Sequence, residues 1–389
     1  MNARLPGILR RAFLFAPVCH AGAMRHDPRA RAILVDVIHP RMLPEHALDR
    51  LNELEELVRT YGGIVVVKTY QKRFTPHPRT FIGPGKVTEL AEEGEGLGVK
   101  LIVINDRLKP RQMYNVGEML SGTGIVAWDR IDLILKIFAK HANTAEARLE
   151  IELASIRHMG PRIFGMGMEL SRQGGGTGTV GIGETNTERM KRHLREQERK
   201  IRERLEKYKT VRAGHQAGRH RAGLKTVAIV GYTNAGKTTL LNAVTGRKEY
   251  AANELFATLD TRVGAVFLPR TKRKALVSDT IGFVKQLPPE LLNAFASTLS
   301  EAVEADLLLH VVDGSDSHAT AHVKVVDEIL ERLGADGILR IMVVNKADAM
   351  GSAVPIALDQ ILNGRPRAFV SAEEGEGIGE LVDRMDGML

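Results

Sequence analysis

The sequence predicts an α/β protein with three parts. These are a small parallel α/β domain over residues 31–130, a long helical hairpin over 131–211 and a larger α/β domain over 223–389. In the first and last parts, apolar runs of strand length alternate with helical patterns, which is typical of parallel sheets. Between them, apolar residues at helical spacing continue through two long stretches. We expect residues 212–222 to be a linker and residues 1–30 to be a disordered leader.

Length and composition agree with a protein of several domains. A chain of 389 residues exceeds what one core usually supports, and 43% hydrophobic with 26% charged residues is a globular composition. The net charge of +8 favours a polyanionic partner, although solubility alone would also explain it. The single cysteine, Cys19, fits a reducing compartment. No apolar stretch approaches the roughly 20 residues that span a bilayer. We expect a cytoplasmic protein and a monomer.

The first 30 residues are rich in arginine, and Asp27 is their only acid. This composition would also fit an organelle transit peptide, a weak signal sequence, or a start codon assigned too early, with Met24 as the true start. Pro6 and Pro17 interrupt a helix there. We favour the disordered leader.

The small α/β domain is predicted from four apolar runs separated by helical patterns. The expected strands are Ile33–Ile38, Gly63–Val67, Val99–Ile104 and Gly124–Ala127, and the expected helices are Pro44–Arg59, Lys86–Glu93 and Arg111–Leu120. The loop Gly83–Lys86 precedes a helix, so it could bind a phosphate or RNA there, but we favour a plain turn and helix cap.

The hairpin combines a basic helix with a glycine-rich segment. Residues 131–160 have a helical pattern, residues 164–183 are rich in glycine and predict a mobile tip, and Thr185–Glu188 is a capping box that starts a long second helix. Many Lys and Arg residues cover that helix. They are either a solvated face with acidic partners one turn away or a surface for RNA phosphates.

The larger domain opens with the pattern of a phosphate-binding loop. The apolar run Thr226–Val230 precedes Gly231–Thr238, which reads GxxxxGKT, and a helical pattern follows. Glycines let backbone N–H groups approach phosphate oxygens, and the helix N-terminus adds partial positive charge. We expect Lys237 to reach the β- and γ-phosphates and Thr238 to hold Mg²⁺. An ordinary strand, turn and helix is the alternative, which this context disfavours.

Three further motifs, each after a strand-like run, indicate the nucleotide. Asp279–Gly282 is a DxxG motif, in which the carboxylate supports Mg²⁺ and the glycine N–H meets the γ-phosphate. Asn345–Asp348 is an NKxD motif, whose final carboxylate accepts hydrogen bonds from guanine N1–H and N2–H₂. After the last run, a backbone N–H near Ser371 would meet guanine O6. Together these motifs predict a Ras-like P-loop GTPase domain that binds GTP and GDP.

The chain resembles the HflX family of GTPases, of the translation-factor-related class. The resemblance rests on Asp279–Glu290, Ala294–Leu299, Glu304–Asp306 and His310–Asp313, with Phe81–Lys86 and Gly181–Thr185 matching two upstream segments of that family. It extends from about Ile33 over nearly the whole chain. The chain departs from the family pattern at Ile182 in place of proline, at Glu373, and around residues 163–168, where the usual tryptophan is missing.

The resemblance has implications for function. Phe256–Asp260 is similar to the first switch, with Thr258 as an Mg²⁺ ligand. The family implies association with the large ribosomal subunit and its rRNA, in rescue or dissociation of stalled ribosomes. The alternative is a GTP-dependent signalling or scaffold protein that acts on a protein partner without RNA.

The expected chemistry lacks a water-orienting glutamine. That residue follows DxxG in Ras-like enzymes, but here the position is Phe283, with Gln286 nearby. We therefore expect slow intrinsic turnover and stimulation by a partner. Asn234 matches a P-loop asparagine that holds K⁺ in some GTPases; an arginine finger from Arg262 or Arg270 is the alternative.

The expected site residues form two sets. The catalytic residues are Lys237, Thr258 and Gly282. The nucleotide-binding residues are Gly231, Tyr232, Thr233, Asn234, Ala235, Gly236, Lys237, Thr238, Thr239, Asp279, Asn345, Lys346, Asp348, Ser371, Ala372 and Glu373. The metal ligands are Thr238, Thr258 and, through water, Asp279 for Mg²⁺, and Asn234 for K⁺.

Overall fold

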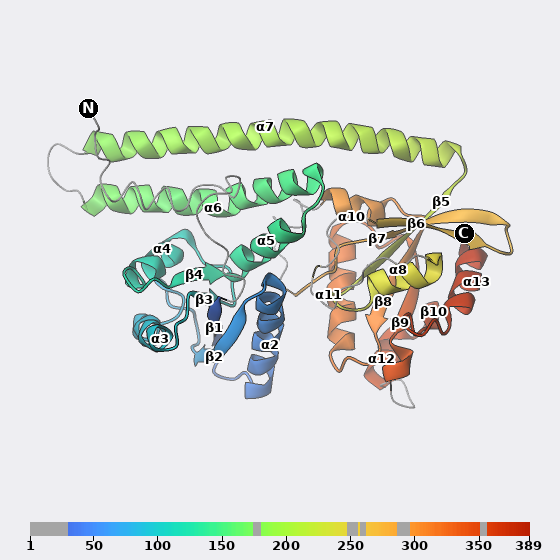
Figure 1. The fold of residues 1–389 in the computed structure, drawn as a ribbon, viewed down its shortest axis with the longest axis horizontal. Helices are drawn as coiled ribbons and strands as arrows, with labels where there is room; N and C mark the ends of the chain where they lie inside the picture. Colours follow the sequence, from blue (N-terminus) through green and yellow to red (C-terminus); the bar gives the residue numbers. More distant parts are fainter. Residues whose placement is uncertain (1–29, 174–179, 247–255, 257–261, 286–295, 351–355) are drawn as a thin grey trace. The chain divides into compact units, whose positions relative to one another are not determined.

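The computed structural model describes residues 30–173, 180–246, 256, 262–285, 296–350 and 356–389 (Figure 1). These residues form two compact units. The first contains the described chain up to Lys136 together with Leu149–Glu203, and the second contains Ile137–Arg148 with Arg204–Leu389. The predicted leader lies outside the described residues.

The first unit is built on a four-stranded parallel sheet of order β2-β1-β3-β4. Its strands are β1 (Arg31–Ile38), β2 (Ile64–Lys72), β3 (Leu101–Ile104) and β4 (Val126–Asp129), and its helices α2 (Pro44–Tyr61), α3 (Pro84–Gly96) and α4 (Pro110–Met119) alternate with them. Each of these helices begins with proline, whose missing N–H would have no partner in a first turn. The predicted parallel α/β arrangement is confirmed.

Three helices follow the first sheet: α5 (Arg130–His141), α6 (Ala145–Gln173) and α7 (Val180–Arg221). The pattern over residues 131–160 predicted one helix, but residues 142–144 are not helical and separate α5 from α6. The Thr144 hydroxyl accepts the Ala147 N–H at 3.2 Å and so caps the start of α6. Helix α6 continues to Gln173 and α7 starts at Val180, so the ends of the predicted glycine-rich loop are helical. The rest of that loop, residues 174–179, lies outside the described residues.

The predicted linker at residues 212–222 is wrong. Helix α7 runs to Arg221 without interruption. Each of Gly214 and Gly218 lowers helix stability by about 1 kcal/mol relative to alanine, and this predicted that the helix would end before them. The ion pair between Arg212 and Glu146 of α6, at 3.0 Å, holds this part of α7 against its neighbour. Tertiary contact therefore outweighs the weak local preference.

The second unit contains a six-stranded sheet of order β10-β9-β8-β5-β7-β6, parallel except for β6. The strands are β5 (Lys225–Gly231), β6 (Arg262–Leu268), β7 (Arg273–Asp279), β8 (Leu307–Asp313), β9 (Leu339–Asn345) and β10 (Arg367–Phe369). The helices are α8 (Lys237–Thr245), α10 (Ala296–Val303), α11 (Ala319–Arg332), α12 (Ile356–Leu362), α13 (Ile378–Met388) and the short 3-10 helix η1 (Ala347–Ala349).

Alternate residues of the central strands pack on opposite faces of this sheet. Val311 and Val343 belong to a core cluster that contains residues of α8 and α13. Their neighbours Val312 and Val344 belong to a second cluster with residues of α11 and α12. Both faces are thus covered by helices, as buried parallel strands require. The carboxyl ends of the strands are left for ligands.

Candidate nucleotide site

The predicted site motifs gather at the carboxyl ends of the parallel strands in the second unit. The phosphate-binding loop follows β5, the DxxG motif begins at the end of β7, and the NKxD motif begins at the end of β9. Segment 371–373 follows β10. Ligands of parallel α/β sheets bind at this edge, so the sheet brings together motifs that are more than 100 residues apart.

Two glycines give the loop its path. A Cβ on Gly231 would lie 2.4 Å from the carbonyl oxygen of Val311 in β8. A Cβ on Gly236 would lie 2.2 Å from Nδ2 of Asn345, and Gly236 has a φ of 89°. Both distances are shorter than a real Cβ atom tolerates. The loop therefore passes against β8 and β9 only because these residues are glycine.

Lys237 begins α8 and is buried, with its Nζ donating to the Tyr232 carbonyl at 2.7 Å. Burial lowers the pKa of Lys237 to about 8, and the charge of Asp279 opposes that shift. A Cβ on Gly282 would lie 2.9 Å from this Nζ. The ammonium and the DxxG glycine are thus adjacent, as a shared γ-phosphate requires.

Oxygen ligands of the kind that Mg²⁺ prefers meet beside the lysine. The Thr238 hydroxyl donates to Oδ2 of Asp279 at 2.7 Å, and Asp279 is fully buried at the end of β7. A hydroxyl and a carboxylate in contact at a helix N-terminus fit a magnesium–phosphate group. Thr258 and its neighbours lie outside the described residues, so its assignment stays a prediction.

Asn345 connects the phosphate loop with the segment after β10. Its Nδ2 donates to the Ala235 carbonyl at 2.9 Å, and its Oδ1 accepts the Ala372 N–H at 3.0 Å. The side chain is only 2% exposed. The two loops that would hold opposite ends of a nucleotide are therefore fastened to one amide.

The remaining base-side residues surround this amide. Lys346 has a φ of 60°, and its Nζ lies 2.6 Å from Oδ2 of Asp313 at the end of β8. Asp348 is exposed on η1, where its carboxylate is accessible. Ser371 is buried, and its hydroxyl accepts the Glu374 N–H at 3.3 Å. Glu373 is exposed. Sequence reasoning missed Asp313, although its place at a strand end was a usable signal.

The chain after the DxxG motif bonds directly to the phosphate loop. Phe283 donates its N–H to the Gly231 carbonyl at 3.1 Å and accepts the Thr233 N–H at 2.8 Å. Its side chain is 1% exposed, so it offers nothing to a water molecule. Arg270 lies in the turn between β6 and β7, at the opposite end of β7 from Asp279. That position disfavours Arg270 as an arginine finger.

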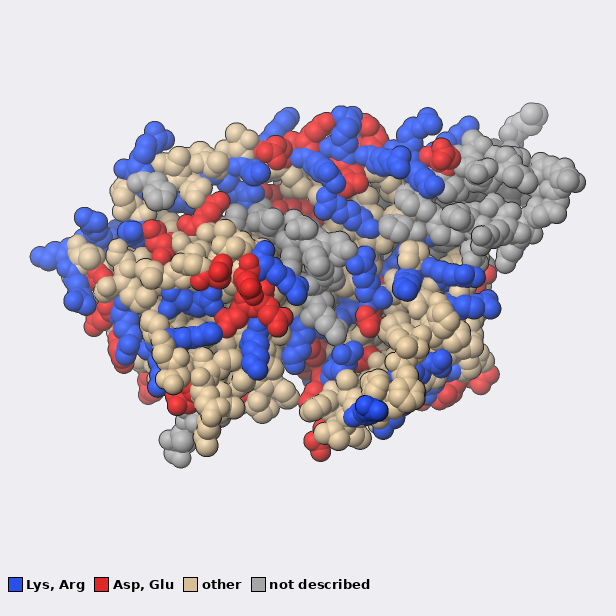
Figure 2. All heavy atoms as spheres, turned by 180° about the vertical axis from the view of Figure 1, so that it is seen from behind, with Lys and Arg blue, Asp and Glu red and all other residues tan. Residues whose placement is uncertain are grey.

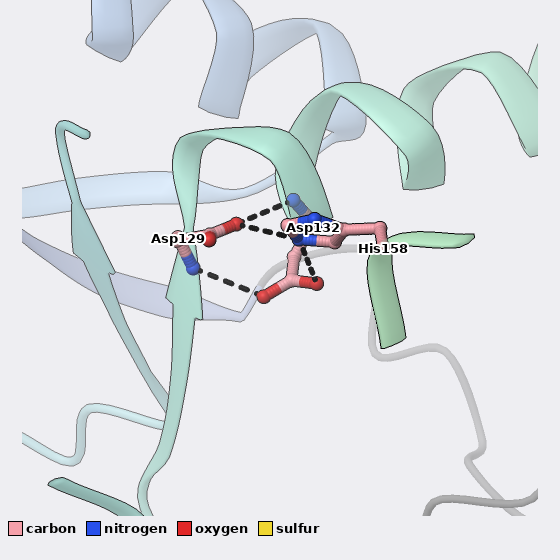
Figure 3. Close-up of side chains that lie close together, drawn as sticks. All are labelled: Asp129, Asp132 and His158. Atoms are coloured by element: carbon pink, nitrogen blue, oxygen red, sulfur yellow. Dashed lines mark hydrogen bonds and ion pairs between the residues drawn. The ribbon is translucent and has the colours of Figure 1, made fainter. Parts of the chain in front are cut away.

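A second polar cluster lies in the first unit, where β4, α5 and α6 meet (Figure 3). Nε2 of His158 is 3.2 Å from Asp129 and 3.3 Å from Asp132. Although two carboxylates and an imidazole could hold a metal, Arg162 is bonded to both carboxylates. The cluster is therefore an internal ion-pair network. Sequence reasoning missed it because its members are up to 33 residues apart.

Loss of this network should destabilise the first unit. Arg162→Ala leaves two buried carboxylates with less compensation, and we expect the free energy of unfolding to fall by about 3 kcal/mol. Arg157 is the matched control, because it pairs with Glu198 at 3.1 Å where the two side chains are 29% and 25% exposed, and Arg157→Ala should cost about 1 kcal/mol or less. Trp128, the only tryptophan, adjoins Asp129 and reports urea unfolding by fluorescence. Equal midpoints for the two variants would contradict this role.

The same network sets a pH dependence. Burial lowers the pKa of His158, but hydrogen bonds to Asp129 and Asp132 outweigh burial, and the net pKa is raised. Because the pKa of His158 is higher in the folded state, its protonation stabilises the fold at pH values below the unfolded pKa of about 6.5. That contribution disappears as pH rises through the higher folded pKa, so wild-type stability should decline there. His158→Gln should flatten the profile measured through Trp128.

The comparisons with known proteins agree with the site. Family models described as GTP-binding GTPase N-terminal, GTP-binding GTPase Middle Region and 50S ribosome-binding GTPase match residues 48–139, 141–219 and 226–346. GTPase HflX of Caldanaerobacter subterraneus is 40% identical over 92% of this chain and 80% of its own. GTPase HflX of Escherichia coli is 37% identical over 92% of this chain and 82% of its own.

The fold of this chain also resembles that of a solved GTP-binding protein. One described as "crystal structure of SsGBP and GDP complex" aligns with a TM-score of 0.51 and 25% identity, covering 92% of this chain and 98% of that chain. Within the described residues, no helix is both long and apolar enough to cross a membrane. The chain belongs to the HflX family of GTPases and is a GTP-binding enzyme that hydrolyses GTP.

Proposed function

We propose that this GTPase binds GTP and GDP at the carboxyl ends of β5, β7 and β9, and that it acts on the large ribosomal subunit in rescue or dissociation of stalled ribosomes. The observation that carries the site is the Asn345 amide, which joins the phosphate loop at Ala235 to the base-side loop at Ala372. The ribosomal partner is supported by the description of the family model that matches residues 226–346. We also propose that the protein acts as a cytoplasmic monomer.

Within this proposal, Thr238 and Asp279 would hold Mg²⁺, with Thr258 as the further ligand. An ion held by these residues would neutralise charge on the β- and γ-phosphates. Lys237 would bind the same phosphates, and Gly282 would present its N–H to the γ-phosphate. Asp348 would accept the guanine N1–H and N2–H₂ groups. Potassium at Asn234 remains a proposal, which a comparison of turnover in KCl and NaCl tests.

Slow intrinsic turnover follows from the position after DxxG. Phe283 is buried and held by two backbone hydrogen bonds, so its side chain cannot orient the attacking water. We therefore expect large subunits to stimulate hydrolysis. GTP turnover measured with and without purified large subunits tests this, and absence of stimulation would favour the protein-partner alternative.

Helix α7 carries the charge that supports RNA contact. Arg199 pairs with Glu196 and Glu203, and Arg202 pairs with Glu198. By contrast, Arg192 and Arg195 are exposed and make no ion pair with any described residue. Figure 2 shows blue and red side chains mixed along the upper edge of the molecule. Only part of the basic face is thus neutralised locally.

Removing the unpaired charges should weaken ribosome binding more than removing paired ones. We expect Arg192→Gln with Arg195→Gln to lower affinity for large subunits and to reduce the slope of log affinity against log salt by up to about two units. The matched control is Arg199→Gln with Arg202→Gln, which removes the same charge from ion-paired positions and should change the slope less. Cosedimentation across a salt series with a GTP analogue measures both. Equal slopes would remove this surface from the proposal.

A further inference from the structure

The tyrosine of the phosphate loop makes contacts that its motif does not require. Any residue satisfies the second position of GxxxxGKT, yet Tyr232 is 7% exposed and accepts hydrogen bonds through both its carbonyl and its hydroxyl. Its carbonyl accepts the Lys237 ammonium at 2.7 Å. Its hydroxyl accepts the backbone N–H of Lys285 at 2.8 Å. Lys285 lies three residues after the DxxG glycine, so the phenol ties the phosphate loop to that segment.

The ring of Tyr232 packs against a histidine of α11. His322 of α11 stacks on it with ring centroids 3.7 Å apart and an angle of 6° between the planes. Nδ1 of His322 lies 2.9 Å from Oδ2 of Asp316. Burial raises the pKa of Asp316, but hydrogen bonds from His322 and from the backbone of His318 outweigh burial and lower it to about 2. The carboxylate is therefore ionised at neutral pH and fixes the imidazole.

The segment after DxxG is bonded to the phosphate loop at three points. Two are the backbone bonds of Phe283, to Gly231 and from Thr233. The third is made by a side chain, the Tyr232 hydroxyl, which accepts the Lys285 N–H. These bonds place Gly282 next to Lys237. A backbone N–H that would contact the γ-phosphate stabilises the transition state better when it is already fixed in place, because a preorganised donor needs no reorganisation during the reaction.

We propose that Tyr232, supported by His322 and Asp316, is a positioning residue for GTP hydrolysis. Its hydroxyl fixes the Phe283–Lys285 backbone, and through it Gly282, against the phosphate loop. The inference rests on the nucleotide site proposed above, because Gly282 must meet the γ-phosphate. It assigns a role in rate to two contacts that the four sequence motifs do not specify: the hydrogen bond of the Tyr232 hydroxyl and the stacking of the His322 imidazole.

The test separates the reaction rate from nucleotide binding. Tyr232→Phe removes only the hydroxyl and keeps the stacked ring. We expect kcat for basal GTP hydrolysis to fall about three- to tenfold, the range of one hydrogen bond, while the Kd for GDP changes by less than about twofold. Hydrogen exchange at the Lys285 amide should become faster. An unchanged or increased kcat, or an equal loss of GDP affinity, would overturn the proposal.

Variants of His322 provide a second, independent test. His322→Ala should lower kcat by a similar factor and His322→Phe should restore most of it, because an aromatic ring preserves stacking. Combined with Tyr232→Phe, His322→Ala should add little, since both act on one contact. His318→Ala is the control, because this 45% exposed side chain lies 3.5 Å from Asp316 but does not stack on Tyr232, so its loss should leave kcat nearly unchanged. Full additivity, or an equal loss in the control, would contradict the proposal.

Failure of the site assignment is distinguishable. If the nucleotide bound elsewhere, Lys237→Ala would leave hydrolysis intact, whatever the tyrosine variants did. If the site is correct and only the positioning role is wrong, Lys237→Ala abolishes hydrolysis while Tyr232→Phe behaves as wild type.

Discussion

Lys237→Ala should lower kcat for GTP hydrolysis by about a thousandfold, the upper range for loss of one preorganised donor. The ammonium is buried between the Tyr232 carbonyl and the position of Gly282, so no solvent cation replaces it. Charge that develops on the transferred phosphoryl group would lose this partner. Single-turnover hydrolysis of radiolabelled GTP measures the effect.

Phe283→Ala is the contrasting variant for that experiment. Phe283 is buried and contributes through its backbone, so truncating its ring should change turnover far less, once folding has been verified. A loss as large as that of Lys237→Ala would mean that the aromatic side chain takes a direct part in the reaction.

Asp348→Asn should change which nucleotide is used. The exposed carboxylate on η1 would accept two guanine N–H groups, and a site built for such donors rejects analogues without them by about 10⁴-fold. An asparagine amide donates instead, which suits the carbonyl of xanthine. We expect the preference for GTP over XTP to collapse and reverse.

Competition binding of GTP and XTP, with wild type beside the variant, measures this change. Glu373→Gln is a suitable control, because it alters an exposed carboxylate of the neighbouring segment without touching the guanine donors. Strong retention of GTP preference in Asp348→Asn would show that another group reads the base.

The second unit could be predicted closely because its information is local. Strand, glycine loop and helix are adjacent in sequence, and each further motif marks a strand end, so the motifs predict both the parallel sheet and its ligand edge. The described part of the site bears out that proximity: Thr238 meets Asp279, and Asn345 meets both loops. Contacts such as Tyr232 with His322 were beyond reach, because no pattern links residues 90 positions apart.

The helical region shows where local reasoning fails. Glycines at 214 and 218 indicated a linker, but Arg212 has a partner in α6 and the helix continues. The break at residues 142–144 was also missed, since a single threonine hydroxyl marks it. The network of Asp129, Asp132 and Arg162 depends on the packing of three elements. Such features are decided by tertiary contact rather than by propensity.

In the proposed site, the shared amide of Asn345 would make binding of the base and binding of the phosphates thermodynamically dependent on each other. A loop that guanine orders would tighten its hold on Ala372, and through the same side chain on Ala235. Coupling between sites is reciprocal in free energy, so phosphates would strengthen recognition of the base by the same factor. Guanosine alone or pyrophosphate alone should each lack this coupling free energy, so the intact nucleotide should bind more tightly than the two fragments predict.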